Sequence, residues 1–230
     1  MEKDSSRPSV LAVIAALNEE EGIGPTLAEL GEVLVDSKFL VVDGNSTDRT
    51  VKIAREMGAE VLFQEGSGKG DSIAQAIKHV DSDEKYVVFI DADFTYPASY
   101  LPGMIQILEE NPDVGMVTGN RFNDSFELSA MKSPFFVGNR FLALTQRFLN
   151  GVSLRDPLTG LRVVRWRILK NWKPKSKGFD IEAEMNHIVE KRGYKTREIP
   201  IYYRNRLGEK KLKLKHGFMI LRRILVESFS

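Results

Sequence analysis

The stretch Tyr86-Val87-Val88-Phe89-Ile90-Asp91-Ala92-Asp93 places two carboxylates directly after the most hydrophobic run of the chain. The run Tyr86–Ile90 is too short for a helix and rich in β-branched and aromatic residues, which favours a buried central strand. Two aspartates at the end of such a strand repel each other unless a cation or a proton lies between them. Because both are oxygen ligands and the chain has no Cys, Asp91 and Asp93 indicate a hard divalent ion, Mg²⁺ or Mn²⁺.

Short apolar runs alternate with helical patterns on both sides of this strand, as far as Phe122. Further strands are expected at Val10–Ala15, Phe39–Val42, Glu60–Phe63 and Val114–Thr118. Helices are expected between them, at Glu19–Leu34, Thr47–Met57, Asp71–Val80 and Tyr100–Glu110. This alternation predicts an α/β fold, with a Rossmann-like, mostly parallel sheet that helices cover on both faces.

The pattern changes after Phe122. We expect helices at Phe135–Leu149 and Asp180–Lys191, and strands at Gly160–Val164 and Glu198–Tyr203. One face of a last helix is expected to carry Leu214, Phe218, Leu221 and Leu225. The sequence therefore predicts one main domain at residues 9–212 with an elaborated C-terminal third, after a tail at 1–8 and before a basic amphipathic helix at 213–230.

Composition excludes several classes of protein. The 230 residues are 42% hydrophobic and 28% charged, as in soluble globular domains, and the lack of Cys excludes disulfides and thiol chemistry. There is no signal-peptide pattern and no apolar run of membrane-spanning length, so a cytoplasmic location is expected. A net charge of +1 argues against a nucleic-acid partner, but Arg204–Arg223 holds eight basic residues and one acidic residue. Such a patch is either a solvated face or a site for phosphate groups or a lipid surface.

Polar clusters follow three of the predicted strands: Asn18-Glu19, Asp43–Asp48 and Asp91-Ala92-Asp93. Ligands of α/β sheets bind beyond the carboxyl ends of the strands, so three clusters at one edge indicate a binding site. The structural alternative for Asp43 is that it caps the following helix. Gly66–Gly70 is glycine-rich and holds a Lys, but it lacks the spacing of a P-loop, so a P-loop is rejected.

Several motifs follow one another along the chain. They are Asn18-Glu19, Val41-Val42-Asp43-Gly44-Asn45-Ser46-Thr47-Asp48-Arg49-Thr50, Asp91-Ala92-Asp93, Gly119-Asn120-Arg121-Phe122, Asp156-Pro157-Leu158-Thr159-Gly160-Leu161-Arg162, Lys177-Gly178-Phe179 with Glu182 and Glu184, Ile199-Pro200-Ile201 and Arg206-Leu207-Gly208-Glu209-Lys210-Lys211-Leu212. Together they resemble the family 2 glycosyltransferases with a GT-A fold, and among these the polyprenyl-phosphate (dolichyl-phosphate mannose) synthases. Leu17 and Thr95 depart from the family's usual Tyr and Gln.

The resemblance implies a role for each matching residue. The donor would be bound by Ala15, Leu17, Glu19, Asp43, Asp91, Ala92, Asp93, Arg206 and Lys211. Within this set, Asp91 and Asp93 would hold the metal, Asp43 would contact the nucleoside, and Arg206 and Lys211 would face the diphosphate. Arg121 and Lys132 would bind the acceptor phosphate, and Asp91, Asp93 and Arg121 would be the catalytic residues.

The implied reaction moves a hexose, with inversion, from a nucleotide diphosphate sugar to a polyprenyl (dolichyl) phosphate. The resemblance favours GDP-mannose as donor; a UDP-sugar, with a lipid phosphate, a soluble phosphorylated compound or a glycan as acceptor, is the alternative. A nucleotidyltransferase would have a glycine-rich basic signature where Asn18–Glu21 is acidic. A non-catalytic sugar-nucleotide binder would not need both aspartates.

A lipid acceptor implies a membrane surface. The basic C-terminus and Phe135–Leu149 are expected to hold the protein peripherally on the anionic cytoplasmic face of a membrane. Packing of the Leu214–Leu225 stripe against the sheet is the equal alternative. Some relatives carry transmembrane helices after the catalytic domain; here either a separate membrane-spanning partner or a chain that continues past Ser230 would replace them.

Overall fold

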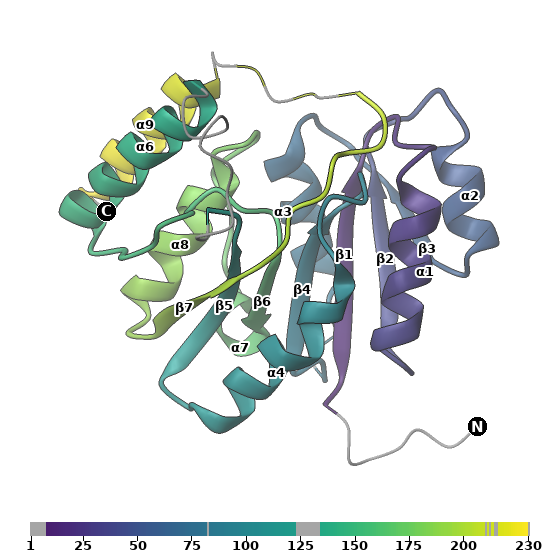
Figure 1. Cartoon of the computed structure of the whole chain (residues 1–230), viewed down its shortest axis with the longest axis horizontal. Helices are drawn as coiled ribbons and strands as arrows, with labels where there is room; N and C mark the ends of the chain where they lie inside the picture. The colour runs from purple at the N-terminus through teal and green to yellow at the C-terminus, as the bar shows by residue number, and fades with distance from the viewer. Residues whose placement is uncertain are drawn as a thin grey trace.

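The strand that ends at Asp91 lies near the middle of a seven-stranded sheet in the computed structural model (Figure 1), which describes residues 8–81, 83–122, 134–209, 211, 213 and 216–229. The strands are β1 Val10–Ala16, β2 Lys38–Asp43, β3 Glu60–Phe63, β4 Tyr86–Asp91, β5 Val114–Asn120, β6 Arg162–Arg165 and β7 Lys195–Pro200. Their order is β3-β2-β1-β4-β6-β5-β7. Only β6 runs antiparallel to its neighbours in this sheet, so the predicted α/β fold with a mostly parallel sheet is confirmed.

Helices cover both faces of the sheet. They are α1 Ile23–Val33, α2 Thr50–Glu56, α3 Lys69–His79, the 3-10 turn η1 Ala98–Tyr100, α4 Leu101–Glu110, α6 Pro134–Asn150, α7 Trp166–Leu169, α8 Ile181–Lys191 and α9 His216–Glu227. One core lies between the sheet and α1, α2 and α4, and the other between the sheet and α3, α7 and α8. Successive side chains of β1 enter opposite cores, because strand residues alternate between the two faces. A buried sheet of this kind holds its strand ends rigidly.

The register brings three strand ends to one level. Ala16 of β1 pairs with Asp43 of β2, and Ala15 pairs with Asp91 of β4. The polar clusters after β1, β2 and β4 therefore meet at one edge of the sheet, as the sequence predicts.

Several predicted boundaries are wrong. The first helix begins at Ile23 rather than Glu19, because Asn18 has a left-handed φ of 48° and the Glu19 N–H donates to Thr50 Oγ1. The second begins at Thr50 rather than Thr47 for a related reason: the loop before it bonds to the loop after β1. The last strand is Lys195–Pro200 rather than Glu198–Tyr203; it is an edge strand with a polar, half-exposed start that apolar patterning misses.

Of the two alternatives for the predicted stripe on the last helix, packing against the sheet is wrong. Helix α9 packs on α6 and α8 through Ile220 and Ile224, which are buried. Phe218 and Leu225 of the expected stripe are exposed, Leu221 is partly buried, and Leu214 lies outside the described residues. Among the described residues, no helix is both long and apolar enough to cross a membrane.

Candidate functional site

Asp91 and Asp93 lie at the floor of the site. Gly160 packs against Asp91 so closely that a Cβ at position 160 would lie 2.3 Å from Asp91 Oδ2, which explains a glycine there. Asp93 is buried, and its Oδ1 accepts hydrogen bonds from the backbone N–H and the hydroxyl of Thr95. Burial, followed by the charge of Asp91, raises the pKa of Asp93. A nearby cation would therefore favour the ionised form of both carboxylates.

The donor set at this floor fits a hard divalent ion. No group of three or more His, Cys, Asp or Glu side chains suited to a metal occurs in the part of the chain that the structure describes. Mg²⁺ is commonly held by one or two carboxylates while substrate phosphates and water complete its shell. Asp91 and Asp93 are thus sufficient as protein ligands if the substrate brings phosphate groups.

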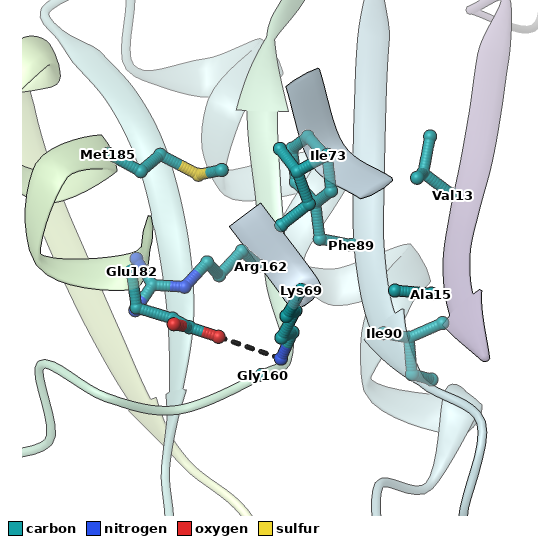
Figure 2. A pocket seen from close by; sticks show the side chains of 10 residues that line it. All are labelled: Val13, Ala15, Lys69, Ile73, Phe89, Ile90, Gly160, Arg162, Glu182 and Met185. Atoms are coloured by element: carbon teal, nitrogen blue, oxygen red, sulfur yellow. Dashed lines mark ion pairs between the residues drawn. The ribbon is translucent and has the colours of Figure 1, made fainter. Parts of the chain in front are cut away.

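Lys69 is one residue of this site that sequence reasoning missed. Its Nζ lies 2.5 Å from Asp91 Oδ1 and 2.7 Å from Glu182 Oε1, over a pocket lined by apolar side chains of β1, β4, α3 and α8 (Figure 2). Burial would lower the pKa of Lys69, but the charges of Asp91 and Glu182 outweigh it and raise the pKa well above its usual value. The ammonium group therefore neutralises Asp91 in the absence of another cation.

The glycines around Lys69 allow close contact between two backbones. A Cβ at Gly68, which has a φ of +86°, would lie 2.4 Å from the Lys177 carbonyl, and one at Gly70 would lie 2.3 Å from the Ser176 carbonyl. The Gly70 N–H donates to the Lys177 carbonyl. Rejection of a P-loop agrees with this geometry, because the glycines at 68 and 70 adjoin protein backbone. The Gly68-Lys69-Gly70 sequence is the one local signal for Lys69. It does not reveal the ion pair with Glu182, because Glu182 is distant in the chain.

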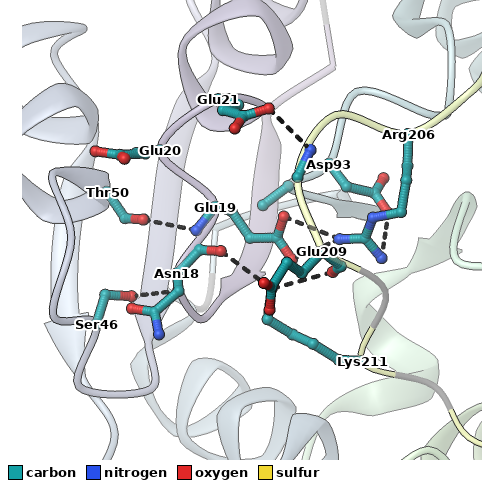
Figure 3. A network of polar contacts seen from close by, with 12 residues as sticks. Asn18, Glu19, Glu20, Glu21, Ser46, Thr50, Asp93, Arg206, Glu209 and Lys211 are labelled. Carbon is teal, nitrogen blue, oxygen red and sulfur yellow. Dashed lines mark hydrogen bonds and ion pairs between the residues drawn. The ribbon is translucent and has the colours of Figure 1, made fainter.

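Glu19 anchors the C-terminal segment across the mouth of the site (Figure 3). Arg206 Nη2 donates to both Glu19 oxygens, at 2.9 and 3.0 Å, and Lys211 Nζ lies 2.7 Å from Glu19 Oε1. Arg206 Nη1 also lies 3.5 Å from Asp93 Oδ2. Burial raises the pKa of Glu19 despite these two cations. The structure thus brings together four residues that are far apart in the sequence: Glu19, Asp93, Arg206 and Lys211.

The segment that carries these cations is tied down by backbone bonds. The N–H groups of Arg204 and Leu207 donate to the carbonyls of Thr95 and Asp93, and the Gly208 N–H donates to Glu21. Residues 204–207 therefore lie against the loop that follows β4, and Gly208 lies against the loop between β1 and α1.

Asp43 is fully buried in the loop after β2. Its two oxygens accept hydrogen bonds from the backbone N–H and the hydroxyl of Ser46, at 2.8 and 2.6 Å. These bonds fold the loop next to Leu17, which is half-exposed. Neither Asp43 nor Ser46 caps the start of α2. A contact from Asp43 to a nucleoside stays a prediction.

Arg121 is held by Asp156 on the opposite wall. Its Nε and Nη2 donate to the two oxygens of Asp156 at 2.7 and 2.8 Å, a bidentate pair, and its guanidinium lies over the rings of Phe122 and Tyr203. Asp156 is fully buried. A role of Arg121 toward an acceptor phosphate stays a prediction, and Lys132 lies outside the described residues.

The Asp156–Arg162 motif builds this wall as one unit. Arg162, only 1% exposed, donates to the carbonyls of Thr159 and Pro157 and to Asn186 Oδ1, and so fixes the loop that carries Asp156 and Gly160. The Gly160 N–H donates to the hydroxyl of Tyr96, whose ring packs edge-on against Tyr203 at 5.1 Å. Sequence reasoning missed both tyrosines, because the contacts of Tyr96 with Tyr203 and with Gly160 join residues far apart in the chain.

Four of the eight basic residues in Arg204–Arg223 are paired with carboxylates. Arg204 pairs with Glu29, Arg206 and Lys211 pair with Glu19, and Arg223 pairs with Asp180 and Glu227. The interpretation of this stretch as one free basic patch is therefore wrong for these four residues.

Comparison with known proteins relates this fold and site to others. The sequence model of the family described as "Glycosyl transferase family 2" matches residues 11–172. A dolichyl-phosphate hexose transferase of Haloferax volcanii is 35% identical over 202 residues, which are 87% of this chain and 85% of that protein. The glycosyltransferase AglJ of the same organism is 35% identical over 196 residues, 85% of this chain and 63% of that protein.

A solved structure has the same fold. Glucosyl-3-phosphoglycerate synthase from Mycobacterium tuberculosis, in complex with Mn²⁺, UDP-glucose and phosphoglyceric acid, superposes with a TM-score of 0.75 at 20% identity, covering 97% of this chain and 81% of that one. The expected GT-A architecture is thus confirmed.

Proposed function

The chain belongs to glycosyl transferase family 2, and from this premise we propose that it transfers a hexose from a nucleotide diphosphate sugar to a polyprenyl (dolichyl) phosphate, with inversion at the anomeric carbon. One observation carries the proposal: the carboxylates Asp91 and Asp93 and the cations Arg206 and Lys211 meet beyond the ends of β1 and β4. Carboxylates for a metal beside cations for phosphates suit a donor that leaves as a diphosphate.

Mg²⁺ or Mn²⁺ would be held by Asp91 and Asp93. When bound, the ion supplies positive charge that neutralises the departing diphosphate. Arg206 adds two N–H donors to the same region, a geometry that suits a phosphate. With a metal ion at Asp91, Lys69 would give up its ion pair with Asp91 and keep the one with Glu182, or turn toward the donor.

The acceptor would enter on the side of Arg121 and Tyr203. A phosphate monoester is anionic at neutral pH, so its oxygen can attack without a strong general base. The bond from that oxygen to the anomeric carbon forms as the bond from the carbon to the diphosphate breaks, and the nucleoside diphosphate leaves with the electron pair. We propose Arg121, which Asp156 orients, as the cation that would bind the acceptor phosphate.

The donor base has two candidates. Resemblance to the mannose synthases favours GDP-mannose. The solved relative in complex with UDP-glucose supports a UDP-sugar as the second candidate. Leu17 and the buried Asp43 are the residues proposed to contact the base and the ribose.

A lipid acceptor places the protein at a membrane surface. The name of the Haloferax relative, a dolichyl-phosphate hexose transferase, supports such an acceptor. We propose that the protein associates peripherally with the cytoplasmic face of a membrane, with or without a separate membrane-spanning partner.

A donor and acceptor screen tests the proposal. Purified protein with Mn²⁺ or Mg²⁺ is given GDP-mannose, UDP-glucose or UDP-galactose, with polyprenyl phosphate in detergent or with phosphoglyceric acid. The proposal predicts a glycosylated lipid phosphate and release of nucleoside diphosphate that depends on the lipid. Transfer only to the water-soluble phosphate would exclude the lipid acceptor while leaving a glycosyltransferase.

A further inference from the structure

Helix α6 exposes an apolar face where a surface helix is normally polar. Its inner side packs on α8 and α9 through Leu142 and through Gln146, which donates to the Ala183 carbonyl. Its outer side carries Val137, Phe141, Leu144 and Phe148, spaced i, i+4, i+7 and i+11, all exposed and Phe148 by 82%. A helix that is apolar on both sides is normally covered by something.

Three arginines border this apolar face. Arg140 and Arg147, seven residues apart on α6, line a cleft of about 270 Å³ with Arg155, which follows the helix. Leu144 of the apolar face lines the same cleft. Within the described part of the chain, none of these three guanidinium groups has an ion-pair partner.

The acidic residue of the cleft is already bonded. Glu198 Oε1 and Oε2 each accept a hydrogen bond, at 2.7 Å, from the backbone N–H of Asp156 and of Arg155. Burial raises the pKa of Glu198, while the two backbone N–H bonds and the charge of Arg155 act in the opposite direction. Helix α6 itself contains no Asp or Glu. The cleft is therefore cationic and lies beside apolar side chains.

We propose that the Arg140–Arg147–Arg155 cleft binds the phosphate headgroup of an anionic lipid, so that the outer face of α6 lies in the headgroup region of a bilayer. An arginine-edged apolar helix face is the pattern of an interfacial helix. Helices α6 and α9 lie together at one end of the molecule, away from α1 and α2 (Figure 1). Phe218 of α9, 79% exposed, adds a second apolar group on that pair of helices.

This inference rests on the proposed function and deepens its membrane association: the sequence already predicts Phe135–Leu149 at the membrane surface, and the cleft adds the three arginines that would bind the lipid. The cleft differs from the donor site, since it includes neither Asp91, Asp93 nor Arg206. Its test therefore needs no donor, metal or polyprenyl acceptor, and failure of the glycosyl transfer would not affect it.

Vesicle binding tests the cleft. Wild type and the triple variant Arg140→Gln, Arg147→Gln, Arg155→Gln are sedimented with phosphatidylcholine vesicles with and without 30% phosphatidylglycerol. The matched control Lys52→Gln, Lys170→Gln, Lys173→Gln removes the same charge from exposed positions elsewhere. Circular dichroism and thermal melts establish that each variant folds.

We expect wild type and control to bind only the anionic vesicles, and the triple variant to bind them about 100-fold more weakly, because each basic residue near such a surface contributes about fivefold. Phe148→Ser should also weaken binding. Equal binding by the triple variant and the control would overturn the proposal. Loss of vesicle binding in millimolar inorganic phosphate would also overturn it, because the cleft would then be a site for free phosphate. A dimer that forms without lipid and that Phe148→Ser dissociates would overturn it as well, because the apolar face of α6 would then bind a second copy of the chain.

Discussion

Lys69 Nζ lies 2.5 Å from Asp91 Oδ1, so the ammonium group of a lysine contacts the carboxylate that is expected to bind the metal. The contact depends on a close approach between Gly68–Gly70 and the backbone at Ser176 and Lys177. A metal ion bound at Asp91 would therefore compete with Lys69 for the same carboxylate.

Removing the competing cation should tighten metal binding. With Lys69→Met, we expect the affinity for Mn²⁺ in the absence of nucleotide to rise about tenfold or more, because a positive charge next to Asp91 is lost. Titration of Mn²⁺ followed by electron paramagnetic resonance measures this. Because Glu182 loses its partner, the variant should also be less stable, by about 3–5 kcal/mol. Unchanged or weaker Mn²⁺ binding by a folded Lys69→Met protein would mean that Lys69 does not compete with the ion.

Loss of either aspartate should abolish turnover without unfolding the protein. Asp91→Asn and Asp93→Asn each remove a charge that a divalent ion needs, so we expect activity to fall by a factor of about 100 or more, and EDTA to mimic them. Asp113→Asn, which alters an exposed carboxylate paired with Lys195, is the control and should retain activity. Full activity of either aspartate variant, or of the wild type in EDTA, would show that the reaction does not depend on a metal at Asp91 and Asp93.

Arg206 should contribute to nucleotide affinity. Arg206→Gln removes the guanidinium that lies between Glu19 and Asp93, and we expect nucleoside diphosphate binding to weaken by about 1.5–3 kcal/mol. Arg204→Gln is the matched control, because Arg204 pairs with Glu29 and lies over the Phe94 ring instead. Calorimetric titration with GDP and with UDP in Mn²⁺ measures the loss and also decides the base. Equal affinities for the two variants would assign Arg206 a structural role only.

Arg223 should contribute to the free energy of unfolding. Its side chain is 11% exposed, and its Nε lies 3.2 Å from Asp180 and 3.8 Å from Glu184. Arg223→Gln leaves these carboxylates without their cation, so we expect a loss of about 1–3 kcal/mol of unfolding free energy. Arg222→Gln, on the exposed side of α9, should change stability little. Urea unfolding distinguishes them, and equal stability of the two variants would contradict the packing of α9 on α8.

The sheet and its strand-end clusters could be predicted because they depend on local patterns. Val87–Ile90 is apolar on both faces, and Asp91 follows it directly, so the position of the carboxylates needs no knowledge of distant contacts. The contacts of Lys69 with Glu182 and of Arg206 with Glu19 join residues more than a hundred positions apart, and no local pattern encodes them.

The orientation of α9 could not be predicted for a different reason. Ile220 and Ile224 form one apolar stripe, and Phe218 and Leu225 belong to another on the same helix. Periodicity alone cannot choose between two apolar stripes. The stripe that is buried is the one that packs against Leu142 of α6 and Ala183 of α8, and it contains the two isoleucines.

Transfer of labelled hexose to polyprenyl phosphate tests the central claim most directly. Wild type and Asp93→Asn are incubated with Mn²⁺, labelled GDP-mannose or UDP-glucose, and equal concentrations of polyprenyl phosphate and phosphoglyceric acid, and the organic and aqueous products are separated. The account predicts label in the lipid phosphate with wild type, with the anomeric configuration inverted, and none with Asp93→Asn. Label confined to the water-soluble product, or equal lipid labelling by Asp93→Asn, would contradict it.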